Sequence, residues 1–309
     1  MINLHAGLEG EYRMVITRGD GTTEDTGWFP NVILNQGLDR LGDSAGIAIM
    51  RYAQVGSGNA APAFTQTSLQ TYVAGGLSSP DSQASSFTND GSPLYRTTLT
   101  YTFVFTQGSV IGNITEVGCG WGSSGATLFS RALILDNLGS PTSIALVAID
   151  QLTVYYRLRI APVVTDTFGS VTLNSINYNY TMRLSTAASF AMVQFLLNSS
   201  SNFSMAQSNG FTPYPAGSVL GPITGSPSGS SGTQGTVTTS TYSLGTYYRD
   251  STFTFSISQG NVAGGIQCIK FTWPQTYSVI NFQARFDNPI PKDNTKVLTL
   301  VLRYSWNRV

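Results

Sequence analysis

One stretch of this chain occurs twice, and this internal repeat constrains the possible folds more than any other feature. Residues 95–121 read YRTTLTYTFVFTQGSVIGNITEVGCGW, and residues 247–273 read YYRDSTFTFSISQGNVAGGIQCIKFTW, at a shift of 152 positions without a gap. Apolar positions are kept between the two copies, and Trp121 falls on Trp273. The repeat therefore predicts two tandem copies of one structural unit.

The residue pattern inside the repeat is that of a β-strand. In Tyr95–Thr106, large apolar residues take odd positions and threonines take most of the even ones. Alternation with a period of two is typical of a half-buried antiparallel strand. Leu152–Ile160 alternates in the same way, and Leu298–Trp306 resembles it in the second copy. Gly10–Arg18 is expected to be a strand, with Ile176–Leu184 in its place in the second copy.

These patterns predict an all-β protein with two tandem, internally duplicated antiparallel β-sandwich domains, jelly-roll-like in kind. The domains are expected at 1–165 and 166–309, with a boundary in the Pro- and Gly-containing segment Pro162–Ser170. Each copy is long enough for its own core, and closure into a barrel stays an open alternative.

One or two short helices and two polar loops complete the expected fold. Asn35–Gly42 has Leu38 and Leu41 three positions apart and ends on glycine, which favours a helix. Thr67–Ala74 is expected to form a second helical turn. Gly75–Pro93 is expected to be a polar loop, and the low-complexity segment Gly210–Ser240 (210–240) a longer Gly/Ser-rich one.

Composition limits the partners of the chain. Charged residues make up 10% of the sequence, against about 25% in ordinary domains, and the net charge is zero. Such surfaces are common where the exterior is buried against other subunits, and they also occur in Ser/Thr-rich extracellular β-proteins. The zero net charge argues against nucleic acid as a main partner, because binding phosphates needs a basic field, and the three lysines (Lys270, Lys292 and Lys296) cannot form a basic patch. No apolar run predicts membrane insertion, and no signal peptide is expected.

The sequence predicts no catalytic, cofactor-binding or metal-binding residues. His5 stands alone, and Cys119 and Cys268 lie at different positions of the two copies, so both are expected to be small apolar residues in strands. Asp136-Asn137 and Asp287-Asn288 are interpreted as turns rather than calcium ligands.

Paired carboxylates could serve a hydrolase that acts on cell-surface polysaccharide. Glu9 with Glu11 and Glu24 with Asp25 are the available pairs. Solvated charges at a sheet edge are the favoured interpretation of both pairs, because neither has an aromatic platform or further carboxylate that the sequence places nearby.

Six residues are candidates for an interface or a recognition surface. Glu116 lies in an apolar strand and is replaced by Cys268 in the second copy, which suggests a subunit contact or a salt bridge. The tyrosines with no clear place in a core face are useful at interfaces and in sugar stacking. Those chosen as candidates are Tyr52, Tyr72, Tyr155, Tyr214 and Tyr242.

The order of short motifs in the first copy resembles that of structural proteins of tailed-bacteriophage virions. The motif segments are Asn35–Leu41 (NQGLDRL), Val55–Pro62 (VGSGNAAP), Thr67–Ala74 (TSLQTYVA), Ile114–Gly118 (ITEVG) and Leu128–Arg131 (LFSR). The resemblance covers most of the first 160 residues, and the second copy lacks the GLxxL and VGSGN segments.

That resemblance implies a non-enzymatic assembly protein of the tail, collar, baseplate or fibre-attachment region. It implies a symmetric homo-oligomer, made in the host cytoplasm and located in the virion, with itself and other virion proteins as partners. A receptor- or carbohydrate-binding tail module is the alternative. In that case tyrosines and the two polar loops would bind a host surface glycan.

Overall fold

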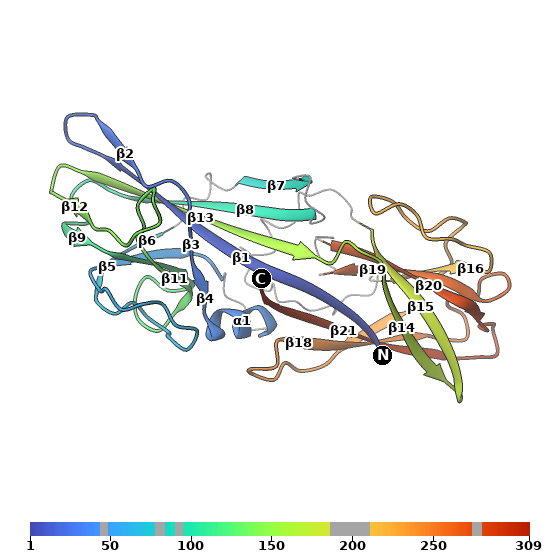
Figure 1. The fold of residues 1–309 in the computed structure, drawn as a ribbon. Coiled ribbons are helices and arrows are strands. Elements are labelled where there is room, and N and C mark those ends of the chain that lie inside the picture. Colours follow the sequence, from blue (N-terminus) through green and yellow to red (C-terminus); the bar gives the residue numbers. More distant parts are fainter. Residues whose placement is uncertain (44–48, 78–83, 90–94, 186–210, 274–279) are drawn as a thin grey trace.

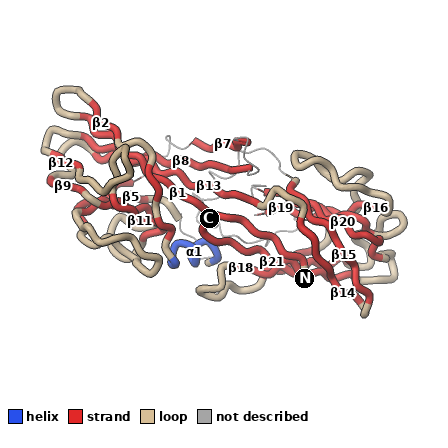
Figure 2. Tube along the Cα trace, viewed as in Figure 1, coloured by secondary structure: helices blue, strands red, loops and turns tan. Residues whose placement is uncertain are grey.

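The computed structural model describes residues 1–43, 49–77, 84–89, 95–185, 211–273 and 280–309. Strands make up nearly all of the regular structure in these residues, so the predicted all-β fold class is confirmed. The molecule is elongated, with one long sheet through its middle and smaller sheets toward both ends (Figures 1 and 2).

The long sheet has nine strands, seven of which follow one another in a single path. In spatial order these are β17 (Thr236–Thr239), β18 (Tyr248–Phe255), β21 (Leu298–Arg308), β1 (Ile2–Thr17), β13 (Gln151–Pro162), β8 (Tyr95–Phe105) and β7 (Ala84–Asn89). Two short strands, β2 (Thr23–Asp25) and β3 (Phe29–Pro30), also pair with β1.

Strand β1 joins the two halves of the chain. It pairs antiparallel with β13 along residues 6–17 and parallel with β21 along residues 2–8. Its inward side chains are buried, including Tyr12, Met14 and Ile16. The strand begins at Ile2 rather than near Gly10, because its first residues pair with a strand about 300 positions away.

Among the described residues, two five-stranded sheets and one two-stranded sheet accompany the long sheet. The first contains β4 (Val32–Ile33), β11 (Leu128–Leu133), β10 (Glu116–Gly120), β5 (Tyr52–Gly56) and β6 (Tyr72–Leu77). The second contains β14 (Thr167–Leu173), β15 (Ile176–Leu184), β20 (Ile280–Ile290), β19 (Ile266–Trp273) and β16 (Phe211–Pro215). The short pair is β12 (Ile144–Leu146) with β9 (Gly112–Ile114).

Aromatic contacts join the second five-stranded sheet to the long sheet. The ring of Phe211 on β16 lies 4.3 Å from that of Phe253 and 4.5 Å from that of Phe255, both on β18. Phe253 also contacts Phe271 of β19 edge-on, with ring centroids 5.9 Å apart. Edge-on ring pairs of this kind stabilise a core beyond the apolar area they bury.

Polar contacts tie the first five-stranded sheet and the helix to the long sheet. The hydroxyls of Tyr12 on β1 and Ser130 on β11 are 2.7 Å apart and buried. Helix α1 (Asn35–Gly42) buries Leu38 and Leu41, as its spacing predicts. The indole N–H of Trp306 on β21 donates to the carbonyl of Leu38 at 2.9 Å, so the helix of the first half is fastened by the last strand.

Repeated sequence segments take comparable places in the sheets. β8 and β18 lie in the long sheet, beside β13 and β21 respectively, and β10 and β19 lie inside the two five-stranded sheets. The glycine of the Gln-Gly turn after each strand has positive φ, 74° at Gly108 and 66° at Gly260. The duplication and the boundary at 165/166 stay predictions, and the halves share one sheet through β1.

Several local predictions are wrong. Residues 72–77 form strand β6 rather than helix, because they pair with β5, and Leu69 is buried beside Leu34 and Leu128. Ile176–Leu184 is a strand, but it pairs with β20; the place beside β21 belongs to β1.

The two predicted polar loops also contain strands. β7 lies within 75–93, and β16 and β17 lie within 210–240. The short apolar segment 191–197 (AMVQFLL), whose sequence predicts a strand or a helical turn, lies outside the described residues.

Candidate functional site

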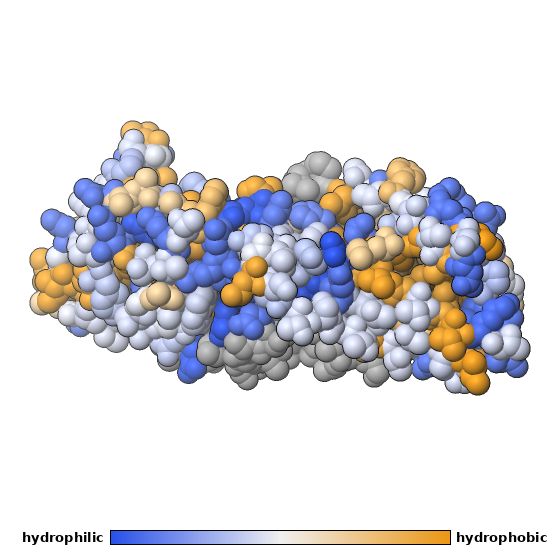
Figure 3. All heavy atoms as spheres, turned by 90° about the horizontal axis from the view of Figure 1, so that it is seen from below, coloured by the Kyte–Doolittle hydropathy of each residue, from blue (hydrophilic) through white to orange (hydrophobic). Residues whose placement is uncertain are grey.

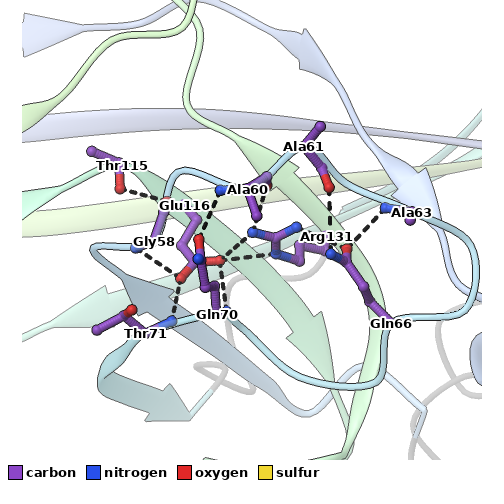
Figure 4. Close-up of polar contacts among 10 residues, drawn as sticks. All are labelled: Gly58, Ala60, Ala61, Ala63, Gln66, Gln70, Thr71, Thr115, Glu116 and Arg131. Carbon is purple, nitrogen blue, oxygen red and sulfur yellow. Dashed lines mark hydrogen bonds and ion pairs between the residues drawn. The ribbon is translucent and has the colours of Figure 1, made fainter.

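Four of the five motif segments of the first half contribute residues to one buried ion-pair network (Figure 4). The fifth segment, Asn35–Leu41, packs beside this network against β11. Glu116 is the first residue of β10, and Arg131 lies on the neighbouring strand β11. Both side chains are completely buried, and the carboxylate accepts from the guanidinium Nε at 2.8 Å with Nη2 at 2.7 Å. An ion pair this deep in a protein requires a full set of hydrogen-bond partners.

Backbone amides of the loop between β5 and β6 supply the remaining partners of the carboxylate. We call this segment, residues 57–71, the 57–71 loop. Oε1 of Glu116 accepts from the N–H groups of Gly58 at 3.0 Å and Thr71 at 2.8 Å. Oε2 accepts from the N–H of Gln70 at 3.1 Å. The carboxylate therefore holds the two ends of the loop together.

Arg131 holds the middle of the same loop. Its Nη1 donates to Oε1 of Gln66 at 2.8 Å, and its Nη2 donates to the carbonyl of Ala60 at 2.9 Å. Gln66 Oε1 also accepts from the N–H of Ala63 at 2.8 Å. A loop of this length without regular structure is thus fixed by side chains beneath it, which is how rigid scaffolds position binding loops.

Close packing explains the glycines of two motif segments. A Cβ at Gly58 would lie 2.5 Å from Oε1 of Glu116, and one at Gly56 would lie 2.4 Å from the carbonyl of Thr71. On α1, a Cβ at Gly37 would lie 2.3 Å from the carbonyl of Phe129. These glycines let the loop and the helix approach the ion pair and its strand.

On its outer side the 57–71 loop presents an aromatic residue. Phe64 is 53% exposed, and the guanidinium of Arg308 stacks 4.2 Å from its ring centroid. Arg308 donates in turn to Oδ1 of Asn35 at 2.6 Å, and Asn35 donates its N–H to the carbonyl of Phe64 at 2.8 Å. The C-terminal strand therefore supports the tip of the loop.

A groove of about 380 Å³ opens beside Phe64, with Glu9, Glu11 and Arg308 among its lining residues. Both carboxylates are engaged: Glu9 pairs with Arg159 at 3.3 Å, and Glu11 pairs with Arg159 at 2.9 Å and with Arg157. The site thus consists of the rigid 57–71 loop, the exposed ring of Phe64 and a groove lined by carboxylates that are held in ion pairs. Such an arrangement suits recognition of a partner surface.

The second pair of carboxylates is also engaged in ion pairs. Hydrogen bonding from Arg18 lowers the pKa of Glu24, and hydrogen bonding from Arg13 lowers the pKa of Asp25. A glycosidase needs one carboxyl with a raised pKa as general acid. Neither of these two carboxyls has such an environment.

Both thiols are shielded. Cys119 and Cys268 are free and buried in β10 and β19, the environment predicted for them. Burial raises the pKa of the Cys119 thiol well above its ordinary value and that of Cys268 to about 12. A protonated, buried thiol is a poor nucleophile.

For Glu116 and Tyr214, the prediction of an accessible interface residue is wrong. Glu116 forms a buried ion pair with Arg131, which confirms the predicted salt bridge. The predicted subunit contact is wrong, because the side chain is completely buried within its own chain. Tyr214 is 7% exposed, because it lies on β16 facing the interior beside Cys268 of β19.

The other four candidate tyrosines keep accessible surface. Tyr72 is 46% exposed at the start of β6. Tyr52 lies under the guanidinium of Arg51, and Tyr155 lies under that of Arg13. The half-buried Tyr242 donates to Oδ1 of Asp39 at 2.7 Å and stacks on Trp306. The structure does not bring these four together into one site.

One predicted turn is confirmed and the other is wrong. Oδ1 of Asp136 accepts from the N–H groups of Leu138 and Ser140, both at 2.9 Å, which is turn chemistry. Asp287 and Asn288 instead belong to strand β20.

Sequence reasoning missed Arg131, Gln66 and Gln70. A usable signal existed for Arg131, since it is an isolated charge inside β11 (LFSRAL), just as Glu116 is the one charge in β10 (EVGCG). Two opposite charges in apolar strands of one sheet predict a buried pair.

Comparison with protein-family models, with curated proteins and with solved structures finds no match to this chain. Across the described part of the chain, no helix has the length and apolar character needed to cross a membrane.

Proposed function

We propose that this chain is a non-enzymatic structural protein of a tailed-bacteriophage virion, assembled as a symmetric homo-oligomer in the tail, collar, baseplate or fibre-attachment region. One observation carries the proposal. The motif segments that resemble such virion proteins contribute to, or pack around, a single buried network centred on Glu116 and Arg131. The motifs therefore act together in the structure, because their residues form or surround the network that holds the 57–71 loop rigid.

Surface chemistry supports an assembly role. Several large apolar side chains are strongly exposed, among them Leu138 at 90%, Phe168 at 79% and Leu244 at 77%. Few charges separate them, because charged residues make up only 10% of the chain. A surface that is poor in charge and carries exposed aromatic and aliphatic groups fits burial against other subunits.

The shared sheet gives a physical reason for the tandem arrangement. A five-stranded sheet lies near each end of the molecule, and the long sheet runs between them. Each chain would then offer two similar sandwich ends to its neighbours. A closed assembly of n chains would then present 2n similar surfaces, which would let it contact rings of different symmetry.

Virion composition tests this proposal directly. The chain should be found in purified phage particles, and the recombinant protein should form a defined oligomer visible by electron microscopy. A protein that stays monomeric at high concentration, is missing from particles and binds no other virion protein would refute it.

A receptor- or carbohydrate-binding tail module is the second candidate. The exposed ring of Phe64 beside its groove and the exposed Tyr72 favour it, because flat aromatic rings stack on sugars. A glycan array with the wild-type protein and the Phe64→Ala and Tyr72→Ala variants tests this idea. Binding that both substitutions leave unchanged would place the glycan site elsewhere.

A further inference from the structure

Strand β14 forms an outer edge of the second five-stranded sheet. Among the described residues it pairs with one strand only, β15, through the register Thr167↔Met182 to Leu173↔Ile176. Its sequence, TFGSVTL, contains no charged residue and no proline. Natural sheet edges are normally protected by charges, prolines, bulges or a covering segment, because an open edge pairs readily with another strand.

The turn after β14 shows which backbone groups face outward. Asn174 and Ser175 have φ values of 48° and 66°, which is typical of a two-residue turn closing a hairpin. In such a hairpin the closing residues, here Leu173 and Ile176, exchange hydrogen bonds, and bonded pairs then alternate along the ladder. The N–H and C=O groups of Phe168, Ser170 and Thr172 therefore point to the open edge.

Among the described residues, a groove lies beside part of this edge. It has a volume of about 300 Å³ and lies between β14 and the first residues of β1, with Asn3, His5, Phe168 and Ser170 among its lining residues. Apolar surface gathers at this end of the molecule (Figure 3), and Phe168 is 79% exposed.

We propose that β14 pairs antiparallel with β14 of a second copy of this chain, about a two-fold axis at Ser170. This inference rests on the proposed homo-oligomeric function and names one of its contacts. Phe168 and Thr172 lie two residues to either side of Ser170, so each copy's Phe168 faces the other copy's Thr172. All outward N–H and C=O groups of the three residues then find partners, giving about six hydrogen bonds.

Charge and side-chain chemistry favour a second copy as the occupant. Identical strands that meet in this way bring no like charges together, since β14 has none. An aromatic residue opposite a β-branched one is a favourable cross-strand pair. Edge strand β16 is a poorer partner, because Pro213 and Pro215 lack the backbone N–H that a ladder requires.

A Ser170→Cys variant tests the axis. Residues directly opposite in a bonded antiparallel pair have Cα atoms about 5.5 Å apart, which is within the range of a disulfide. The two natural cysteines are buried, so position 170 would carry the only accessible thiol. Under mild oxidation we expect a disulfide-linked dimer on a non-reducing gel.

Thr172→Cys is the matched control on the same strand. Its equivalent in the second copy would lie four residues further along, about 14 Å away, so it should link at least tenfold more slowly. Mixed Phe168→Cys and Thr172→Cys proteins should link to each other. Self-linking of Thr172→Cys in preference to Ser170→Cys would overturn the proposed register.

A charge at the axis provides the second test. Ser170→Lys should weaken self-association at least tenfold by sedimentation, whereas Ser170→Thr should keep it; circular dichroism would check that both variants fold. An oligomer that persists with Ser170→Lys and leaves Ser170→Cys unlinked would refute the β14 contact without affecting the proposed function. A wild-type chain that never self-associates would also refute the β14 contact. The proposed function would then still be tested by whether the chain is present in purified phage particles.

Discussion

Replacing Glu116 by glutamine should unfold the 57–71 loop and destabilise the protein. The carboxylate faces five N–H groups, three from the loop backbone and two from Arg131. A glutamine amide has only one acceptor oxygen, so its NH₂ group would face donors in either orientation. Arg131 would keep its charge with no counter-charge while completely buried. Removing one partner of a buried ion pair costs about 3–5 kcal/mol.

Urea unfolding measures this loss. With a slope of about 3 kcal/mol per molar, the midpoint of the Glu116→Gln variant should fall by about 1–2 M. Hydrogen exchange locates the effect, because the amides of Gly58, Gln70 and Thr71 should lose protection before the sheet does. Arg131→Met should behave similarly, and the double variant should cost less than the sum of the single ones, since the pair acts as a unit.

An exposed ion pair serves as the control. Arg13 and Asp25 have side chains that are 37% and 41% exposed, and Asp25→Asn should cost less than about 1 kcal/mol. If Glu116→Gln shifts the midpoint no more than Asp25→Asn does, the ion pair does not hold the loop. Equal loss of protection in the loop and in the sheet would contradict the local role.

Three further predictions concern single contacts. Gly58→Ala should destabilise the protein by about 1–3 kcal/mol in urea unfolding, because its Cβ would lie 2.5 Å from Oε1 of Glu116, and an unchanged midpoint would contradict this packing. The pKa of Asp150 is lowered by the N–H of Val147 and by Arg18, so its contribution to stability is complete above about pH 4 and is lost as pH falls further; Asp150→Asn should flatten the acid side of the stability–pH curve. Tyr242→Phe removes the hydrogen bond to Asp39 and should cost about 0.5–1.5 kcal/mol in thermal unfolding, whereas no change would show that the ring contact alone matters.

Period-two patterns predicted the core faces well, because burial alternates on a pleated strand whatever its partners are. Tyr101, Phe103 and Phe105 on β8 are all buried, as are the even-numbered residues from Leu152 to Ile160 on β13. Helix α1 was equally accessible to prediction, since its two leucines and closing glycine are local signals.

Pairing between distant strands could not be predicted in the same way. Residues 2–8 of β1 pair with β21, and no feature of either sequence segment indicates which strand is its partner. The candidate site shows the same limit. Glu116 is recognisable in the sequence as an isolated charge in an apolar strand. Its hydrogen bonds, however, go to backbone amides of residues 58, 70 and 71, and the sequence does not show which backbone amides a side chain will contact.

The burial of Tyr214 could not be predicted from sequence for a related reason. Its neighbours in sequence are proline-rich and polar, which suggests a loop, whereas the pairing of β16 with β19 places its ring inside the protein. Exposure of a single aromatic residue depends on the sheet around it, and that sheet is assembled from far-apart segments.

The parallel pairing of β1 with β21 also has a consequence during synthesis. The first residues of β1 leave the ribosome about 300 positions before Leu302–Arg308, which complete their ladder. Until then, one edge of β1 near Ile2–Leu8 stays open in the growing chain, and contacts of such long sequence separation form slowly. A chain that stops short of residue 302 would leave this edge permanently open. Synthesis of β21 is therefore the step that pairs this edge of β1 and removes a site of aggregation.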